Sequence, residues 1–276
     1  MSTSQDEKAR RFRALHDRPG AFVMPNPWDA GTARMLAALG FEALATTSAG
    51  LAFSLGRRDG AGLVTRDEAL AHARSIVEAA DLPVSADLEN CFGDAPGVVA
   101  ETIRQAAGVG LVGASVEDAT GDADNPIYDF TLAVDRVAAA VAAARALPFP
   151  FVVTARSENF LHGRRDLPDT LRRLQAFAAA GADVLYAPGL PDLAAVTAVC
   201  AAVAPRPVNV LAGPPGFTVA NLAAAGVRRI SVGGLLARAA FGAFLRGARE
   251  IADGGTFGFA AEAASFAEIS GFMAGR

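Results

Sequence analysis

Three carboxylate residues follow apolar stretches in a way that suggests metal chemistry. The segment SADLENCFGD, residues 85–94, places Asp87 and Glu89 two positions apart after one apolar run, and Glu117 ends a later run. Neighbouring carboxylates in a dry cleft raise one another's pKa values unless a cation neutralises them. All-oxygen ligands, without a Cys pair or a helical His pair nearby, favour Mg²⁺ or Mn²⁺ over Zn²⁺. The sequence therefore predicts a metal site formed by Asp87, Glu89 and Glu117.

A second reading of the same acids stays open. Acids at strand ends also cap the following helix or pair with arginine. If the strand continues through both residues, Asp87 and Glu89 point the same way, because side chains at i and i+2 share one face of a strand. Either reading requires parallel strands that bring these acids to one edge.

The elements that must position these acids are regular. Apolar runs rich in β-branched residues alternate with Ala-rich segments of helical period, which indicates parallel strands covered by helices. We expect strands at 21–25, 43–47, 83–87, 111–117, 151–155, 183–187, 208–212 and 229–233. We expect helices at 29–39, 66–80, 98–107, 132–145, 170–180, 192–203, 219–225 and 235–248. Eight βα units in roughly 250 residues are the size of one (β/α)8 TIM-type barrel, here a single domain over 1–276. An open doubly wound sheet is the alternative, but its G-x-G-x-x-G fingerprint is absent.

In such a barrel the carboxyl ends of the strands form the active-site face. Five strand ends carry polar residues, at 26–29, 46–50, 87–90, 117–118 and 156–159. The sixth and seventh are followed only by Ala, Gly and Pro, at 187–189 and 212–215. We therefore expect a site built mainly by strands one to five.

Composition narrows the class of partner. The chain has 276 residues, of which 52% are apolar, and a formal net charge of -4 without a basic stripe of the kind that binds nucleic acid. Its N-terminus is polar, and no run approaches the length of a membrane span. Cys91 and Cys200 lie far apart and are expected to be reduced thiols. We expect a cytoplasmic protein that acts on a small molecule, with neither nucleic acid nor membrane as partner.

Several motifs in register resemble the isocitrate lyase/phosphoenolpyruvate mutase superfamily. They are N-P-W-D-A at 26–30, T-T-S-A-G at 46–50, R-D-G at 58–60, D-x-E at 87–89, V-E-D at 116–118 and T-A-R-S-E at 154–158. The resemblance covers residues 20–240 approximately. It implies a modified β/α barrel whose last helix is exchanged with a neighbouring subunit, in a homodimer or homotetramer. It also implies that Mg²⁺ binds a 2-oxo acid that becomes an enolate.

The resemblance also implies roles for single residues. Asp87 and Glu89 are expected to hold the metal, with Asp59 and Glu117 contacting it through water. Asp59 is also a candidate catalytic residue, and Asp87 faces the substrate as well as the metal.

The same resemblance assigns the substrate contacts. Ser48, with the backbone N–H groups of Ala49 and Gly50, is expected to bind the substrate carboxylate, and Trp28 lies in the opening turn of the site. Arg156 is expected to donate to the 2-oxo oxygen or the carboxylate and to be catalytic. The alternative for Arg156 is a buried salt bridge to Glu117 or Glu158.

The loop after strand four departs from the best-known branches. Residues 118–129 read D-A-T-G-D-A-D-N-P-I-Y-D, without the cysteine of the K-K-C-G-H-like loop found in isocitrate and methylisocitrate lyases. Asn125 matches the catalytic asparagine of the phosphonate branches, but Ala123 stands at their lysine. Tyr186 and Ala187 stand where lyases carry an acid after strand six, and His162 is a further candidate proton carrier.

These features predict an enolate-forming enzyme that cleaves a C–C bond of a small 2-oxo or 2-hydroxy di- or tricarboxylic acid. We expect decarboxylation or hydrolysis of an oxaloacetate-type acid, or a retro-aldol reaction. These reactions are consistent with a loop that lacks the proton-donating cysteine of the best-known lyases. The alternatives are C–P bond chemistry on phosphonopyruvate and a non-catalytic protein that binds 2-oxo acids.

Overall fold

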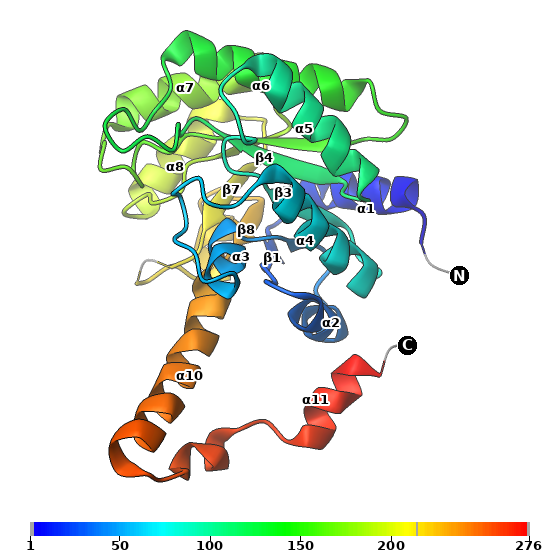
Figure 1. Ribbon diagram of the computed structural model, residues 1–276. Helices are drawn as coiled ribbons and strands as arrows, with labels where there is room; N and C mark the ends of the chain where they lie inside the picture. The colour runs from blue at the N-terminus through cyan, green and yellow to red at the C-terminus, as the bar shows by residue number, and fades with distance from the viewer. Residues whose placement is uncertain (1–2, 214, 275–276) are drawn as a thin grey trace.

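Eight parallel strands form a nearly closed barrel in the computed structural model, which describes residues 3–213 and 215–274 (Figure 1). The strands are β1 (Phe22–Met24), β2 (Leu44–Ala45), β3 (Val84–Asp87), β4 (Gly113–Glu117), β5 (Val152–Arg156), β6 (Val184–Tyr186), β7 (Val208–Leu211) and β8 (Arg229–Ser231). β8 pairs with both β7 and β1, and the Ala45 N–H donates to the Pro25 carbonyl at 3.1 Å, next to the open seam between β1 and β2. The predicted TIM-type barrel is confirmed. Pro214, from the predicted end of strand seven, lies outside the described residues.

A helix follows each strand along the chain, and most of the helices cover the barrel. They are α1 (Gln5–Asp17), α2 (Ala30–Ala38), α3 (Ser48–Ser54), α4 (Arg66–Ala79), α5 (Pro96–Gly108), α6 (Phe130–Arg145), α7 (Leu167–Ala179), α8 (Leu193–Val203), α9 (Val219–Ala224), α10 (Leu235–Gly254) and α11 (Phe266–Met273), with a 3-10 turn η1 (Gly258–Glu262). Side chains fix several N-termini: Thr65 caps α4 in a capping box with Glu68. The predicted starts of α5 and α7 are two to three residues late. The helices begin at Pro96 and just before Pro168, because a proline in the first turn of a helix does not need its missing N–H group.

Three helices, α1, α3 and α11, are not among the eight that the sequence analysis expects. α1 begins with a capping box of Ser4 and Glu7, and its apolar face carries Ala9, Phe12 and Leu15 among many charged residues. Phe12 is fully buried and packs in one cluster with Val112, Val152 and Val184 of the barrel, together with Phe22. Fully burying such a side chain stabilises the fold by roughly 1.5–3 kcal/mol. α1 therefore forms part of the barrel's hydrophobic core.

The helical layer packs against the outward faces of the strands. One cluster joins helices α4, α5 and α6 to β3, β4 and β5, and contains Ile76, Ile103, Val116, Phe151 and Val153. A second joins helices α7, α8 and α9 to the later strands, and contains Phe177, Leu185, Val196, Leu222 and Ile230. These clusters leave the strand ends free to carry polar side chains.

The C-terminal segment extends away from the barrel. Figure 1 shows α10 projecting outward and the chain then turning back, so that α11 approaches α2. The Arg34 guanidinium donates to the Met273 carbonyl at 2.6 Å, which ties α11 to α2. Phe244, Phe257 and Phe266 are 70%, 66% and 90% exposed along this segment. Among the helices in the described part of the chain, none has the length and apolar character needed to span a membrane.

Candidate active site

A pocket of about 170 Å³, the inner pocket, lies at the carboxyl ends of the strands. Every strand, or the stretch that follows it, contributes a polar side chain to its wall: Asn26, Thr46, Asp87, Ser115, Arg156, Tyr186, Asn209 and Ser231. The expectation of a site built mainly by strands one to five is therefore too narrow. The later strands contribute polar side chains from within β6, β7 and β8, and Pro188, Gly233 and Gly234, which follow β6 and β8, also line the pocket.

Asp87 is the central acceptor of the inner pocket. Its Oδ1 lies 2.7 Å from Nη1 of Arg156, and its Oδ2 accepts from the Ser48 hydroxyl at 3.0 Å and the Ser48 N–H at 3.3 Å. The Asp87 N–H donates to the Thr46 hydroxyl oxygen at 2.9 Å, which fixes the end of β3 against β2. Asp87 thus accepts from the Arg156 guanidinium, from the hydroxyl and N–H of Ser48, and from the Ser115 hydroxyl at 3.4 Å.

Arg156 is surrounded by acids on three sides. In addition to Asp87, its Nη2 lies 3.2 Å from Glu117 and its Nε lies 2.8 Å from Glu158. Burial alone would lower the pKa of Arg156, but Glu158, Asp87 and Glu117 raise it well above its ordinary value. The salt bridges that were the alternative for Arg156 are therefore present, and the guanidinium also lines the pocket.

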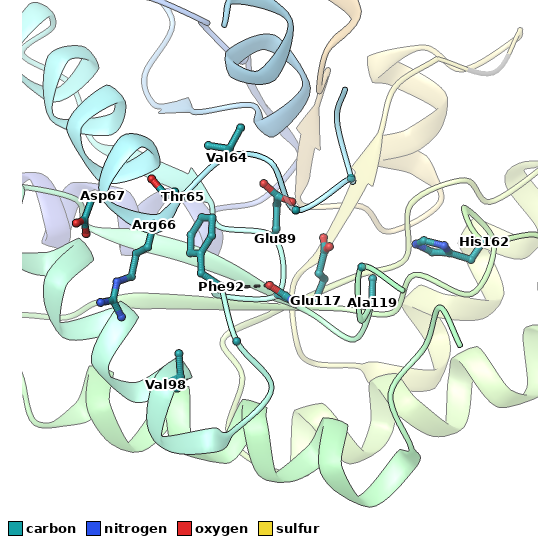
Figure 2. Close-up of a pocket in the computed structure, with 15 residues that line it drawn as sticks. Val64, Thr65, Arg66, Asp67, Glu89, Phe92, Val98, Glu117, Ala119 and His162 are labelled. Atoms are coloured by element: carbon teal, nitrogen blue, oxygen red, sulfur yellow. Dashed lines mark hydrogen bonds between the residues drawn. The ribbon is translucent and has the colours of Figure 1, made fainter. Parts of the chain in front are cut away.

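A larger cavity of about 800 Å³, the outer cavity, opens beside the inner pocket. Glu89 and Glu117 both line it, and Figure 2 shows their carboxylates near its centre with His162 beyond them. Asp87 and Glu89 do not share a strand face, because β3 ends at Asp87 and Glu89 adopts a left-handed backbone with φ of 50°. They border different cavities.

The carboxylates at this junction repel one another. Burial, then Asp87 and Asp59, raise the pKa of Glu89 to about 7. Burial and Asp87 likewise raise the pKa of Asp59. Burial raises the pKa of Glu117 well above its ordinary range, although Arg156 opposes the shift.

This donor chemistry fits a hard divalent cation. Burial and the repulsion between neighbouring carboxylates raise the pKa values of Asp59 and Glu89, and a cation would relieve that repulsion. No set of three His, Cys, Asp or Glu within residues 3–213 and 215–274 is arranged as a ready ligand cage. The reason is visible in the geometry, because Arg156 occupies the space between Asp87 and Glu117.

The predicted carboxylate-binding turn is a helix start. Thr47 caps α3, and Ser48 and Ala49 line the inner pocket. Gly50 does not line it: its N–H donates to the Thr47 hydroxyl at 3.2 Å. A Cβ on Gly50 would lie 2.7 Å from Trp28 Cβ and from Thr47 Cγ2, so this glycine permits close packing. Trp28 stands behind the turn, and its carbonyl lies 2.8 Å from Nε2 of His72.

The loop after β4 places its candidates outside the inner pocket. Asn125 is exposed, and its carbonyl accepts from the Thr120 hydroxyl at 2.6 Å. Asp118 is buried beneath the loop and pairs with Arg173 at 3.1 Å. Burial raises the pKa of Asp118 to about 6. His162 is exposed at the rim of the outer cavity.

Both cysteines are free thiols, as expected. Cys91 is fully buried, and burial raises the pKa of its thiol to about 12. A thiol of this kind is a poor nucleophile or acid/base group at neutral pH.

Five polar residues of the inner pocket had no role in the sequence prediction. They are Asn26, Ser85, Ser115, Asn209 and Ser231. Asn26 accepts from the N–H groups of Val232 and Gly233 at 3.0 and 2.9 Å. Asn209 donates to the Ser231 hydroxyl at 3.0 Å. Polar residues at inward positions inside otherwise apolar strands are the signal that identifies such groups.

Tyr186 lies directly beside the guanidinium of the site. The Arg156 guanidinium lies 5.1 Å from the centre of the Tyr186 ring. Burial raises the pKa of the Tyr186 hydroxyl to about 12, so it stays protonated at neutral pH.

Comparisons with known proteins find a matching family and several relatives of this chain. The model of the family described as phosphoenolpyruvate phosphomutase matches residues 12–252. Uncharacterized protein Rv1998c of Mycobacterium tuberculosis is 31% identical over 243 residues, which cover 88% of this chain and 89% of that one.

Two solved structures extend the likeness to three dimensions. One from Burkholderia cenocepacia J2315, whose name assigns it only provisionally as a lyase/mutase, is 61% identical with a TM-score of 0.94, covering 98% of this chain and 96% of that one. Oxaloacetate acetylhydrolase in complex with the product oxalate is 25% identical with a TM-score of 0.87, covering 98% and 94% of the two chains.

Proposed function

The chain belongs to the phosphoenolpyruvate phosphomutase family, and we propose that it is a cytoplasmic, Mg²⁺-dependent enzyme that cleaves a C–C bond of a small 2-oxo or 2-hydroxy di- or tricarboxylic acid. Oxaloacetate-type decarboxylation or hydrolysis is the reaction we favour, and a retro-aldol cleavage is the next. The similar fold of oxaloacetate acetylhydrolase supports the choice of acid.

One observation carries the proposal: Arg156, Asp87 and Ser48 meet in a pocket that has room for only a small acid. A guanidinium, a hydroxyl and helix N-terminal N–H groups are the donors that a carboxylate and a neighbouring oxo group need. Four further polar side chains, Asn26, Ser115, Asn209 and Ser231, surround the same space. Such a polar lining suits an anionic substrate rather than an apolar one.

The chain's own residues divide the work as follows. Ser48 and the N–H of Ala49 bind the substrate carboxylate, while the planar fork of Arg156 donates to the 2-oxo oxygen. In doing so Arg156 exchanges part of its contact with Asp87 for a contact with substrate. As the bond one carbon from the carbonyl breaks, negative charge grows on that oxygen, and Arg156 stabilises it more strongly than it stabilises the ground state.

Asp87 and Glu89 would hold Mg²⁺, with Asp59 and Glu117 beside them. When bound, Mg²⁺ supplies a second positive charge toward the same substrate oxygen. Decarboxylation requires no proton donor for the departing group, because CO₂ leaves without a proton. A reaction that needs no such donor is consistent with the loop after β4, which carries no cysteine over residues 118–129.

C–P bond chemistry is the alternative reaction, and it has less support. Ala123 takes the place of the loop lysine, and Asn125 is exposed away from the lining of both cavities. The quaternary structure we propose is a homodimer or homotetramer that exchanges the exposed C-terminal segment, since only Ala237 and Gly247 of α10 are buried within one chain.

A substrate screen tests the function. Purified protein with Mg²⁺ is incubated with oxaloacetate, isocitrate, methylisocitrate, dimethylmalate and phosphonopyruvate, and products are followed by proton NMR against an Asp87→Ala control. Turnover of one acid above the control identifies the bond that breaks. Mg²⁺-dependent line broadening of a ligand without product would instead identify a binding protein. Turnover of phosphonopyruvate alone would select the C–P reaction.

A further inference from the structure

A buried arginine that no proposed step uses lies behind the Glu89 segment. Arg136 of α6 is 1% exposed, and no ion pair joins it to an acid in the described part of the chain. A buried cation without an acid partner is costly unless its hydrogen bonds are well satisfied. Its partners therefore indicate what it is for.

Arg136 donates through Nη1 and Nη2 to backbone carbonyls of one segment, whereas its Nε has no hydrogen-bond partner in the described part of the chain. Nη1 donates to the carbonyls of Gly93 and Asp94 at 2.5 and 2.6 Å, and Nη2 donates to the carbonyl of Asn90. We name residues 88–94 the Glu89 turn. The Thr102 hydroxyl donates to the Cys91 carbonyl at 3.0 Å, so most of the carbonyls in the turn are held from α5 and α6.

The Glu89 turn has an unusual backbone. Glu89, Cys91 and Phe92 have φ angles of 50°, 60° and 63°, in the left-handed region that favours glycine. Non-glycine residues in this region cost about 1 kcal/mol or more each, and they persist only where the surroundings hold them. Three such residues within four positions require an external clamp, and the carbonyl contacts of Arg136 supply one.

Tyr128 connects the clamp to the loop after β4. The Arg136 guanidinium lies 4.2 Å from the Tyr128 ring centre, and the Tyr128 hydroxyl donates to Asp94 at 2.5 Å. Asn90 donates to the Tyr128 hydroxyl at 3.3 Å and to the Thr120 carbonyl at 3.2 Å. The turn and both ends of the loop therefore share one network.

We propose that Arg136 is a positioning residue that holds the strained Glu89 turn, and thereby keeps the Glu89 carboxylate at the proposed metal site against the repulsion of Asp87 and Asp59. The inference rests on the proposed function for its metal, and on the geometry for its clamp. Without Arg136 the turn relaxes toward ordinary backbone angles. Glu89 then swings away from the other acids.

The test compares Arg136→Met with Arg145→Met. Arg145 lies on the same helix and also donates to backbone carbonyls, those of Phe151 and Gly181, but it pairs with the Asp183 carboxylate at 2.6 Å and lies at the opposite end of the barrel. Mg²⁺ affinity is measured by calorimetry on the full chain, and amide hydrogen exchange is measured over 88–94. We expect Arg136→Met to weaken Mg²⁺ binding about 10–100-fold, the usual range for partners that orient a metal ligand, and to speed exchange in the turn. Arg145→Met should change neither.

Two further variants keep the test decisive. Tyr128→Phe removes only the hydroxyl, so it serves if Arg136→Met does not fold, and it should shift both readouts in the same direction. Adding Arg136→Met to Glu89→Gln should weaken Mg²⁺ binding little further, because Arg136 acts through Glu89.

Normal Mg²⁺ affinity in folded Arg136→Met and Tyr128→Phe would overturn the positioning role, and so would a loss fully additive with Glu89→Gln. A wild-type chain that binds no Mg²⁺ would overturn the proposed metal site and, with it, the metal part of the inference. Unchanged exchange over 88–94 would overturn the clamp independently of any metal.

Discussion

Arg156 Nη1 lies 2.7 Å from Asp87 Oδ1, so the guanidinium proposed to bind substrate rests on the carboxylate proposed to bind metal. The guanidinium and the carboxylate therefore neutralise each other within the inner pocket. In the proposed reaction, substrate binds Arg156 and Mg²⁺ binds Asp87, so both compete with the contact between these two side chains. The first two predictions follow from this contact.

Arg156→Lys should lower turnover about 10²-fold or more, because a lysine keeps the charge but loses the planar fork that donates to two oxygens. Mg²⁺ affinity in the absence of substrate should not fall, since the weaker contact frees Asp87. Steady-state kinetics and Mg²⁺ calorimetry measure the two effects. Arg145→Lys, remote from both cavities, is the control. An unchanged rate would return Arg156 to a purely structural role.

Asp87→Ala should abolish Mg²⁺-dependent ligand binding while the chain stays folded, because Arg156 keeps its contacts with Glu117 and Glu158. Removing one partner from a buried ion pair is harmful when the other charge is left alone, and here it is not. Calorimetry with oxalate and Mg²⁺ gives the binding, and circular dichroism gives the fold. Normal binding by the folded variant would contradict the metal assignment.

The loss of folding stability at acidic pH should depend on His16. Burial, and then repulsion by Arg229, lower the pKa of His16 to about 3, while its Nδ1 faces the Phe12 carbonyl at 2.8 Å and Arg13 adds repulsion. A lowered folded-state pKa means that the unfolded chain binds the proton first. Stability is therefore full above about pH 6.5 and is lost as pH falls toward 3, by about 1.4 kcal/mol for each pH unit of that window.

His16→Gln should flatten this pH dependence, as measured by urea unfolding between pH 4 and 7. His162→Gln is the matched control, because His162 is exposed at the cavity rim and should leave the slope intact. A slope that survives in His16→Gln would assign the acid sensitivity to other groups.

Much of the barrel could be predicted because each strand is a short apolar run and each helix has a clear period. The acids at the ends of β3 and β4 were visible for the same reason. The roles of Asn209 and Ser231 were missed because the sequence shows a polar residue inside an apolar run but not what it faces. Both residues face the inner pocket, which forms only when all eight strands come together. The left-handed turn at Glu89 was not predicted, because tertiary contacts from Arg136 hold it together with local hydrogen bonds such as the one from the Phe92 N–H to the Asn90 side chain.

Gly50 shows how a correct motif can carry a different role. Gly50→Ala should destabilise the chain by about 1–3 kcal/mol, because its Cβ would meet Trp28 and Thr47 at 2.7 Å. Gly97→Ala in α5 meets nothing within 4 Å and should be neutral or stabilising. Thermal unfolding compares the two. Equal stability of Gly50→Ala and wild type would show that the turn adjusts freely.

The exposed aromatic side chains of the C-terminal segment predict association between copies. A monomer rarely leaves a contiguous apolar patch open to water, and Phe244 and Phe266 are 70% and 90% exposed. Light scattering should give a mass that is a multiple of the single chain. Phe244→Ser with Phe266→Ser should shift it toward the monomer, because the patch loses its largest apolar groups. Val219→Ser, which removes an exposed apolar residue of α9, should not. A wild-type monomer would leave the exchanged segment without a partner and would refute the proposed assembly.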